Sequence, residues 1–139
     1  MVDRDIVIAK IANIQKSLNR LKEKQGIDAA DFLKNRDIQD VVLLNLQTAI
    51  QGCVDIASHI ISDSGWNIPG SMAGLFDILC QKKAISEKTR DIMRPMVGFR
   101  NLIVHEYAEL DMSMVYDIFY KKISDFNLFL KEISLFAGL

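Results

Sequence analysis

The chain has 139 residues, of which half are hydrophobic and a quarter charged, and its formal net charge is −1. This length suits a single domain over residues 1–139 with a buried core, and the balance of apolar and charged residues excludes an intrinsically disordered chain. A near-neutral net charge excludes a molecule that attracts nucleic acid over its whole surface, so any such binding must come from a local patch.

No segment predicts a membrane span or an export signal. The longest run without a charged residue, 41–54, has 14 residues and includes three amide side chains, which makes it too short and too polar to cross a bilayer. The first residues lack the basic lead and apolar block of a secretion signal, so we expect a cytoplasmic protein. In that reducing compartment, Cys53 and Cys80 are expected to be small buried side chains rather than a disulfide.

Helical periodicity begins almost at once. A first helix is expected over 3–24, where apolar residues recur at spacings of four and three. After Gly26, a short turn and helix follow over 28–35, with Asp28 as the N-cap. A second long helix, 36–62, is apolar along two neighbouring seams. This pattern predicts a central place in a bundle, one half of a subunit interface, or both.

The loop 64–70 separates these elements from three further helices. Ser71 is expected to cap a short helix, and Ser86 a longer one that contains Pro95. The last helix is expected to run over 112–136, with Asp111 as its N-cap. Four substantial helices and a short one, joined by short connections, predict an all-α fold, an antiparallel four-helix bundle with an additional short helix.

One stretch of eight residues, 100–107, brings together Arg100, Asn101, His105 and Tyr107. If a helix ran through it, Arg100 and Tyr107 would lie within about 20° of each other around the helix axis. Asn101 and His105, four residues apart, would be neighbours. A guanidinium beside a titratable imidazole suits chemistry on a phosphate group.

Other chemistries lack the residues that they need. A zinc motif built on His105 would need a second histidine where Glu109 stands. His59, with Asp55 and Asp63 four residues away on either side, is expected to be a surface or half-buried histidine with a carboxylate neighbour. No glycine-rich phosphate loop or nucleophile motif is present in the sequence. We therefore expect neither a metal nor a cofactor.

The same stretch also allows a purely structural interpretation. His105 would end a helix, where a histidine interacts favourably with the helix dipole and bonds the last carbonyls. Tyr107 would cover the edge of the core, and Arg100 would be an ordinary surface cation. Spacing alone favours this structural interpretation over a catalytic one.

A resemblance changes that balance. The stretch resembles the R-x4-H-x-Y motif of HEPN-domain proteins and, more narrowly, the HepT family of toxins. Segments 45–51 and 53–61 are similar to that family's second-helix signature, and Gly98 and Phe99 before the motif and Asp111 after it also fit. The resemblance covers most of the chain.

The resemblance implies a metal-independent endoribonuclease that acts as a homodimer, with the two motifs near the shared interface. His105 would be the general base or acid toward the ribose 2′-hydroxyl that attacks the adjacent phosphate. Arg100 would stabilise the charge that builds on the phosphoryl oxygens, and Asn101 would orient one of these groups.

The resemblance also implies a partner, a minimal nucleotidyltransferase antitoxin of the MntA type that transfers AMP to the motif tyrosine. Tyr107 would be the acceptor, and its bulky anionic adduct beside His105 would block the entry of RNA. Glu106 has no assigned purpose. Two alternatives stay open: a non-catalytic HEPN module that binds nucleotide or substrate for a partner nucleotidyltransferase, and a structural helical oligomer.

Overall fold

The computed structural model describes residues 2–139, and all the regular elements in that range are helical. In chain order they are α1 (Arg4–Lys24), α2 (Ala29–Lys34), α3 (Arg36–Asp63), α4 (Met72–Gln81), α5 (Glu87–His105), the 3-10 helix η1 (Tyr107–Glu109), α6 (Met112–Lys121) and α7 (Ile123–Phe136).

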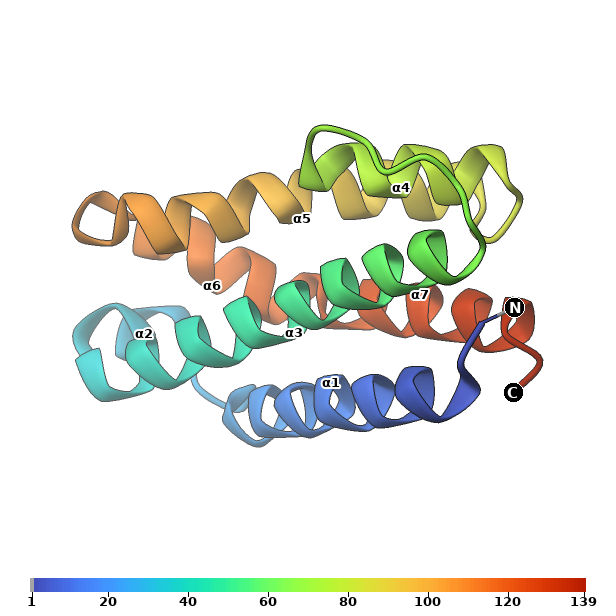
Figure 1. Ribbon diagram of the computed structural model, residues 1–139. Helices are drawn as coiled ribbons and strands as arrows, with labels where there is room; N and C mark the ends of the chain where they lie inside the picture. Colours follow the sequence, from blue (N-terminus) through green and yellow to red (C-terminus); the bar gives the residue numbers. More distant parts are fainter. Residues whose placement is uncertain (1) are drawn as a thin grey trace.

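Four long units run alternately in opposite directions: α1, α3, α5 and the consecutive pair α6–α7 (Figure 1). The predicted antiparallel four-helix bundle is therefore confirmed. Two short helices supplement it, both at positions expected from the sequence although the predicted architecture counted one: α2 joins α1 to α3, and α4 packs beside α5 and α3.

Helix α3 lies at the centre of the bundle, in contact with α1, α2, α4, α5 and α6. Both of its predicted apolar seams are buried, namely Leu43, Leu46, Ile50, Cys53, Ala57 and Ile60 in one and Val42, Ala49 and Ile56 in the other. By length and mean hydropathy α3 is apolar enough to cross a bilayer, and half of its most apolar window is buried inside the bundle. Packing against five other helices accounts for this apolar character.

The predicted N-caps are in place. Asp28, Ser71, Ser86 and Asp111 each accept a hydrogen bond from a backbone N–H in the first turn of the helix that they precede. Each such bond satisfies a helix-end donor and contributes on the order of 1 kcal/mol. These caps determine where the short loops of the bundle begin and end.

The two cysteines are free, as predicted. Cys53 is buried on α3, and this burial raises the pKa of its thiol far above the ordinary value. Cys80 is only half-buried, near the end of α4. Cys53 is therefore a packing residue rather than a reactive thiol.

The expected continuous last helix is wrong. It ends as α6 at Lys121 and begins again as α7 at Ile123, with Lys122 between them. The two halves follow different partners, because α6 packs against α2 and α3 whereas α7 packs against α5 and α1. Buried residues continue at helical spacing across the break, at Phe119, Ile123 and Phe126, so the sequence carries no local signal for it.

The chain ends meet at one end of the bundle (Figure 1). The backbone N–H of Asp3 donates to Oδ2 of Asp63 at 2.8 Å, and Nη2 of Arg4 donates to the carbonyl of Gly138 at 2.7 Å. The C-terminal end of α5 lies at the opposite end of the molecule.

Candidate active site

Arg100, Asn101 and His105 lie in the last two turns of α5, and apolar residues fix how that helix is rotated. Phe99 and Ile103 are buried in the core, which turns the residues between and after them outward. Arg100 is consequently half-buried, whereas Asn101 and His105 are exposed. The alternation of buried and polar residues therefore determines which side chains face solvent.

An open groove of about 380 Å³ lies between α5 and the start of α4, and Arg100, Asn101 and His105 all line it. Its other lining residues are Ser71, Met72, Ala73, Arg94, Val97 and Gly98. The guanidinium and the imidazole thus open onto the same solvent-accessible space. An anionic group lying in this groove can meet both.

The guanidinium of Arg100 is only partly satisfied by the protein. Its Nη1 donates to Oδ1 of Asn101 at 3.0 Å, and its buried Nε has no hydrogen-bond partner. No ion pair joins Arg100 to a carboxylate in the described part of the chain. Arg94 lines the same groove but is paired with Asp77 of α4. Arg100 therefore has free donors and an uncompensated charge for an anion.

Tyr107 does not lie where a continuous helix would put it. Helix α5 ends at His105, and Glu106 leaves the helical conformation with φ −133° and ψ 35°. The continuous helix that would have put Arg100 and Tyr107 on one face is therefore not formed, and Tyr107 does not line the groove. Tyr107 is instead the first residue of η1, and the residue is 44% exposed.

The hydroxyl of Tyr107 donates a hydrogen bond to Oδ1 of Asp40, on the second turn of α3. This bond and partial burial raise the pKa of the hydroxyl above its ordinary value, and the positive charge of Arg36 opposes part of that shift. Sequence reasoning did not find Asp40, because 67 positions separate it from Tyr107 and no spacing rule links them.

The second histidine is placed differently. Nε2 of His59 lies 3.0 Å from Oδ2 of Asp63 one turn later on α3, and the histidine side chain is 20% exposed. This confirms a half-buried histidine with a carboxylate neighbour. Residues 2–139 include no group of three or more histidine, cysteine and acidic side chains arranged to hold a metal ion.

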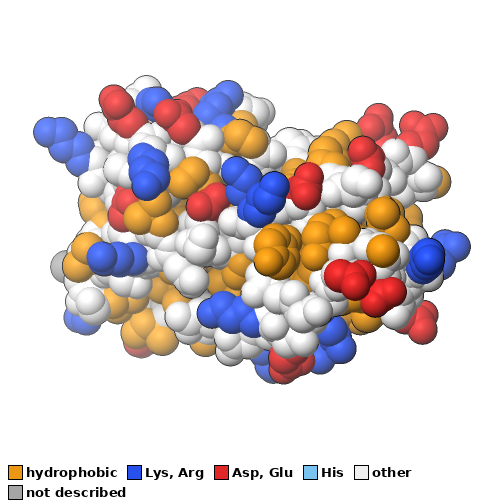
Figure 2. Space-filling view, turned by 180° about the vertical axis from the view of Figure 1, so that it is seen from behind, with side chains coloured by type: hydrophobic (Ala, Val, Ile, Leu, Met, Phe, Trp, Pro, Cys, Tyr) orange, Lys and Arg blue, Asp and Glu red, His pale blue; other side chains and the backbone are white. Residues whose placement is uncertain are grey.

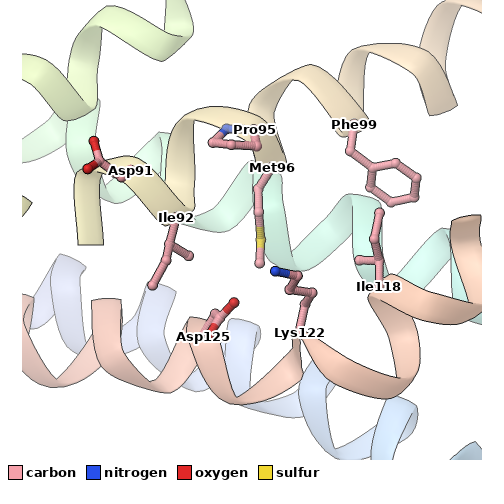
Figure 3. A pocket seen from close by; sticks show the side chains of 8 residues that line it. All are labelled: Asp91, Ile92, Pro95, Met96, Phe99, Ile118, Lys122 and Asp125. Carbon is pink, nitrogen blue, oxygen red and sulfur yellow. The ribbon is translucent and has the colours of Figure 1, made fainter. Parts of the chain in front are cut away.

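A smaller cavity of about 180 Å³ lies between α5 and the α6–α7 pair (Figure 3). Ile92, Met96 and Phe99 project into it from α5, toward Ile118 and Lys122 on the other side. It contains neither an imidazole nor a guanidinium, and the motif side chains do not line it. It is more enclosed than the groove, but it lacks the groups for phosphate chemistry.

Charges of both signs alternate with apolar side chains on the face opposite to that of Figure 1 (Figure 2). This distribution matches the net charge of −1. This view shows no continuous basic area on that face.

Comparison with known proteins relates this arrangement to a family. A family model described as ribonuclease HepT-like matches residues 14–133. The chain is 36% identical over 129 residues to the mRNA nuclease HepT of Shewanella oneidensis, an alignment that covers 93% of this chain and 96% of that protein. It is also 26% identical over 131 residues to the tRNA nuclease HepT of Aphanizomenon flos-aquae, covering 93% and 88%.

Solved structures similar to this chain indicate the same family. The tri-AMPylated Shewanella oneidensis HEPN toxin, in complex with an MNT antitoxin, superimposes with a TM-score of 0.88 at 35% identity and covers 96% of this chain and 99% of its own. A toxin–antitoxin structure with AMP-PNP gives a TM-score of 0.87 at 34% identity, covering 95% and 99%. A cytosolic Bacillus subtilis protein of unknown function shares the fold, with a TM-score of 0.85 at 19% identity over 97% of this chain and 90% of its own.

Proposed function

This chain belongs to the HepT-like ribonuclease family, and we propose that it is the ribonuclease toxin of a toxin–antitoxin pair. In this proposal it cuts RNA without a metal ion, through attack of a ribose 2′-hydroxyl on the adjacent phosphate. The observation that carries the proposal is the groove that Arg100 and His105 share at the end of α5.

His105 performs the proton transfers. It removes the proton of the 2′-hydroxyl, or protonates the departing 5′-oxygen, as the P–O5′ bond breaks and a 2′,3′-cyclic phosphate forms. An imidazole suits both roles, because its ordinary pKa of about 6.5 makes both protonation states available near neutral pH. The exposed position of His105 gives an extended RNA strand access to the ring.

Arg100 stabilises the charge that builds on the phosphoryl oxygens in the transition state. Its planar fork can bond two oxygens at once, and no carboxylate among residues 2–139 forms an ion pair with it. Asn101 accepts a hydrogen bond from Nη1 of Arg100. We therefore assign Asn101 the task of orienting the guanidinium toward the groove.

A nucleotidyltransferase antitoxin of the MntA type neutralises the toxin by transferring AMP to Tyr107. Tyr107, a residue that is 44% exposed, lies two positions after His105, so an enzyme can reach it. The adduct adds a bulky group and a negative charge next to the path of the RNA. The complexes of relatives with an antitoxin and with AMP-PNP support this assignment.

We place two copies of the chain in a cytoplasmic homodimer, with their motifs near the interface. Leu102 and Val104, on the last turns of α5, are 36% and 40% exposed. Exposed apolar side chains that alternate with the motif residues are the kind of surface that a second copy covers.

The cleavage proposal is tested with purified protein and single-stranded RNA in the presence of a chelator. Arg100→Ala and His105→Ala should each abolish cleavage and the cyclic phosphate ends. Arg94→Ala is the matched control, because Arg94 lines the same groove but is paired with Asp77. Its cleavage rate should stay within a few-fold of that of the wild type.

Full activity of both alanine variants would contradict the proposal. If instead the wild type bound RNA or nucleotide without cutting it, and Arg100→Ala weakened that binding, the chain would be a non-catalytic binding module.

AMP transfer is tested by incubation with the cognate antitoxin and ATP, followed by mass spectrometry of peptides. We expect the adduct on Tyr107 in the wild type and none in Tyr107→Phe. Tyr120→Phe is the control, since Tyr120 is also exposed, at 57%, and should leave modification unchanged. An adduct that persists in Tyr107→Phe would identify a different acceptor.

A further inference from the structure

The three tyrosines of the chain differ in what their hydroxyls contact. Tyr116 donates to the backbone carbonyl of Ile27 at 3.0 Å, and the ring of Tyr120 stacks on that of Tyr116. Tyr107 alone among them donates to a side-chain carboxylate, that of Asp40. The proposed acceptor oxygen is therefore also the one whose proton already points at a base.

We propose that Asp40 is the general base for AMP transfer to Tyr107, a catalytic residue that the toxin itself supplies. This inference rests on the AMP transfer proposed above. The carboxylate touches the reacting oxygen, and the exposed side chains of Asp40 and Tyr107 leave room for a triphosphate on the solvent side.

The step balances as a substitution at phosphorus. The phenolic oxygen of Tyr107 forms a bond to the α-phosphorus of ATP, and the bond from that phosphorus to the pyrophosphate oxygen breaks. The proton of the hydroxyl passes to Oδ1 of Asp40, and pyrophosphate carries the bonding electron pair away. The toxin keeps one new phosphodiester, and no oxidant or reductant is needed.

Tyrosine needs such a base at neutral pH. Phenolate is scarce far below an ordinary pKa of about 10, and the hydrogen bond to Asp40 raises the pKa of this hydroxyl further. The hydroxyl therefore keeps its proton in the resting toxin and loses it only as the bond to phosphorus forms. General-base assistance of this type contributes about 10²–10⁴-fold to a rate.

A purely structural role explains the contact less well. Both side chains are exposed, and an exposed hydrogen bond contributes little net stability because water replaces it. Asp40 and Arg36 are the two charged groups that act on the hydroxyl electrostatically. They lie one turn apart on α3, so a single helix face carries the base and a cation close to the incoming phosphate.

The test measures the initial rate of AMP transfer to the full-length chain by its antitoxin and ATP, from pH 6.5 to pH 9.5. Asp40→Asn keeps the shape of the side chain but removes its basicity. Asp37→Asn is the matched control, because Asp37 is exposed on the same helix and has no contact with Tyr107. Thermal unfolding by circular dichroism checks that each variant is folded.

We expect Asp40→Asn to slow transfer at least 100-fold at pH 7, and Asp37→Asn to match the wild type. The deficit of Asp40→Asn should shrink as pH rises, because ionisation of the phenol in water replaces the missing base. Transfer by folded Asp40→Asn at the wild-type rate, or a deficit that does not change with pH, would overturn the role of Asp40.

The failure of this inference can be told apart from that of the proposed function. If wild-type Tyr107 receives no AMP at all, the proposed acceptor is wrong. A second measurement needs no antitoxin: the pKa of Tyr107, followed by NMR, should fall in Asp40→Asn. An unchanged titration would show that the contact is absent in solution and would overturn the inference by itself.

Discussion

Two long helices of this bundle end close to a histidine, and the two ends differ in whether a carboxylate lies beside the imidazole ring. Nε2 of the half-buried His59 on α3 lies 3.0 Å from Oδ2 of Asp63 one turn later, and the same carboxylate accepts the N–H of Asp3. His105 is the last residue of α5, is exposed, and lines a groove together with Arg100. The same residue type thus lies beside a carboxylate at one end of the molecule and faces a solvent-accessible groove at the other.

The difference lies in where the polar partners are. A histidine with a carboxylate four residues later finds that partner within its own helix, and the pair stabilises the helix end. His105 has no residue of α5 after it, and Glu106 already leaves the helix. Its neighbour on the groove is a cation with free donors, an arrangement that adds no stability by itself but suits an anionic ligand.

The largest expected contrast is in RNA cleavage, between variants in which one or the other histidine is replaced by glutamine. Glutamine still forms hydrogen bonds but cannot exchange a proton near neutral pH, so His105→Gln should lower RNA cleavage by about 10²–10⁴-fold. His59→Gln should cleave at the wild-type rate, because His59 faces Asp63 rather than the groove. Equal losses in the two variants would abolish the distinction between the two helix ends.

Two glycines should respond in opposite directions. A Cβ added at Gly52 of α3 would lie 2.5 Å from Cγ1 of Ile14 on α1, so Gly52→Ala should lower the free energy of unfolding by about 1–3 kcal/mol. A Cβ at Gly98 of α5 meets nothing within 4 Å, so Gly98→Ala should raise it by about 0.5–1 kcal/mol. Denaturant unfolding measures both, and a stabilising Gly52→Ala would mean that α1 and α3 are less closely packed.

For thermodynamic stability, in contrast to RNA cleavage, replacing His59 should have a larger effect than replacing His105. His59→Ala removes a half-buried partner of Asp63 and should lower the free energy of unfolding by about 1 kcal/mol. His105→Ala removes an exposed side chain and should stay within about 0.5 kcal/mol of the wild type. Chemical denaturation of both variants in one buffer tests this pair, and a larger loss for His105→Ala would favour the structural interpretation of the motif.

The smallest expected effect is a loss of folding stability at alkaline pH, which arises from Tyr107 just beyond the end of α5. Because the folded state raises the pKa of Tyr107, the unfolded chain releases this proton first, and folding stability falls as pH rises above about 10. The contribution of Tyr107 to folding stability is thus fully present below pH 10, and it is lost as the pH rises through the pKa of Tyr107 in the folded state. We expect the difference in melting temperature between wild type and Tyr107→Phe to shrink over that range. A constant difference would indicate that the bond to Asp40 is not involved.

Much of the fold could be predicted from local rules. Apolar spacing and N-cap residues such as Ser71 and Ser86 act over a few positions, and the structure follows them closely. The break at Lys122 could not be predicted, because it arises from the different packing partners of α6 and α7. That information lies in tertiary contacts rather than in the residues around position 122.

The candidate site divides in the same way. Helical spacing places Asn101 and His105 on one groove with Arg100, as the structure shows. The helical extrapolation fails at Tyr107 because a helix end is a property of backbone dihedral angles at one residue, Glu106. The contact between Tyr107 and Asp40 could not be predicted from the sequence, because it depends on how α5 and α3 are placed relative to each other in three dimensions.

The two chain ends meet at the pole of the molecule opposite to His105 (Figure 1), where Arg4 donates to Gly138. An affinity handle or a fluorescent reporter fused to either end would therefore project away from the groove. Immobilised through such a handle on a sensor surface, the protein would present the groove to the flowing solution, where binding of the proposed RNA substrate can be measured.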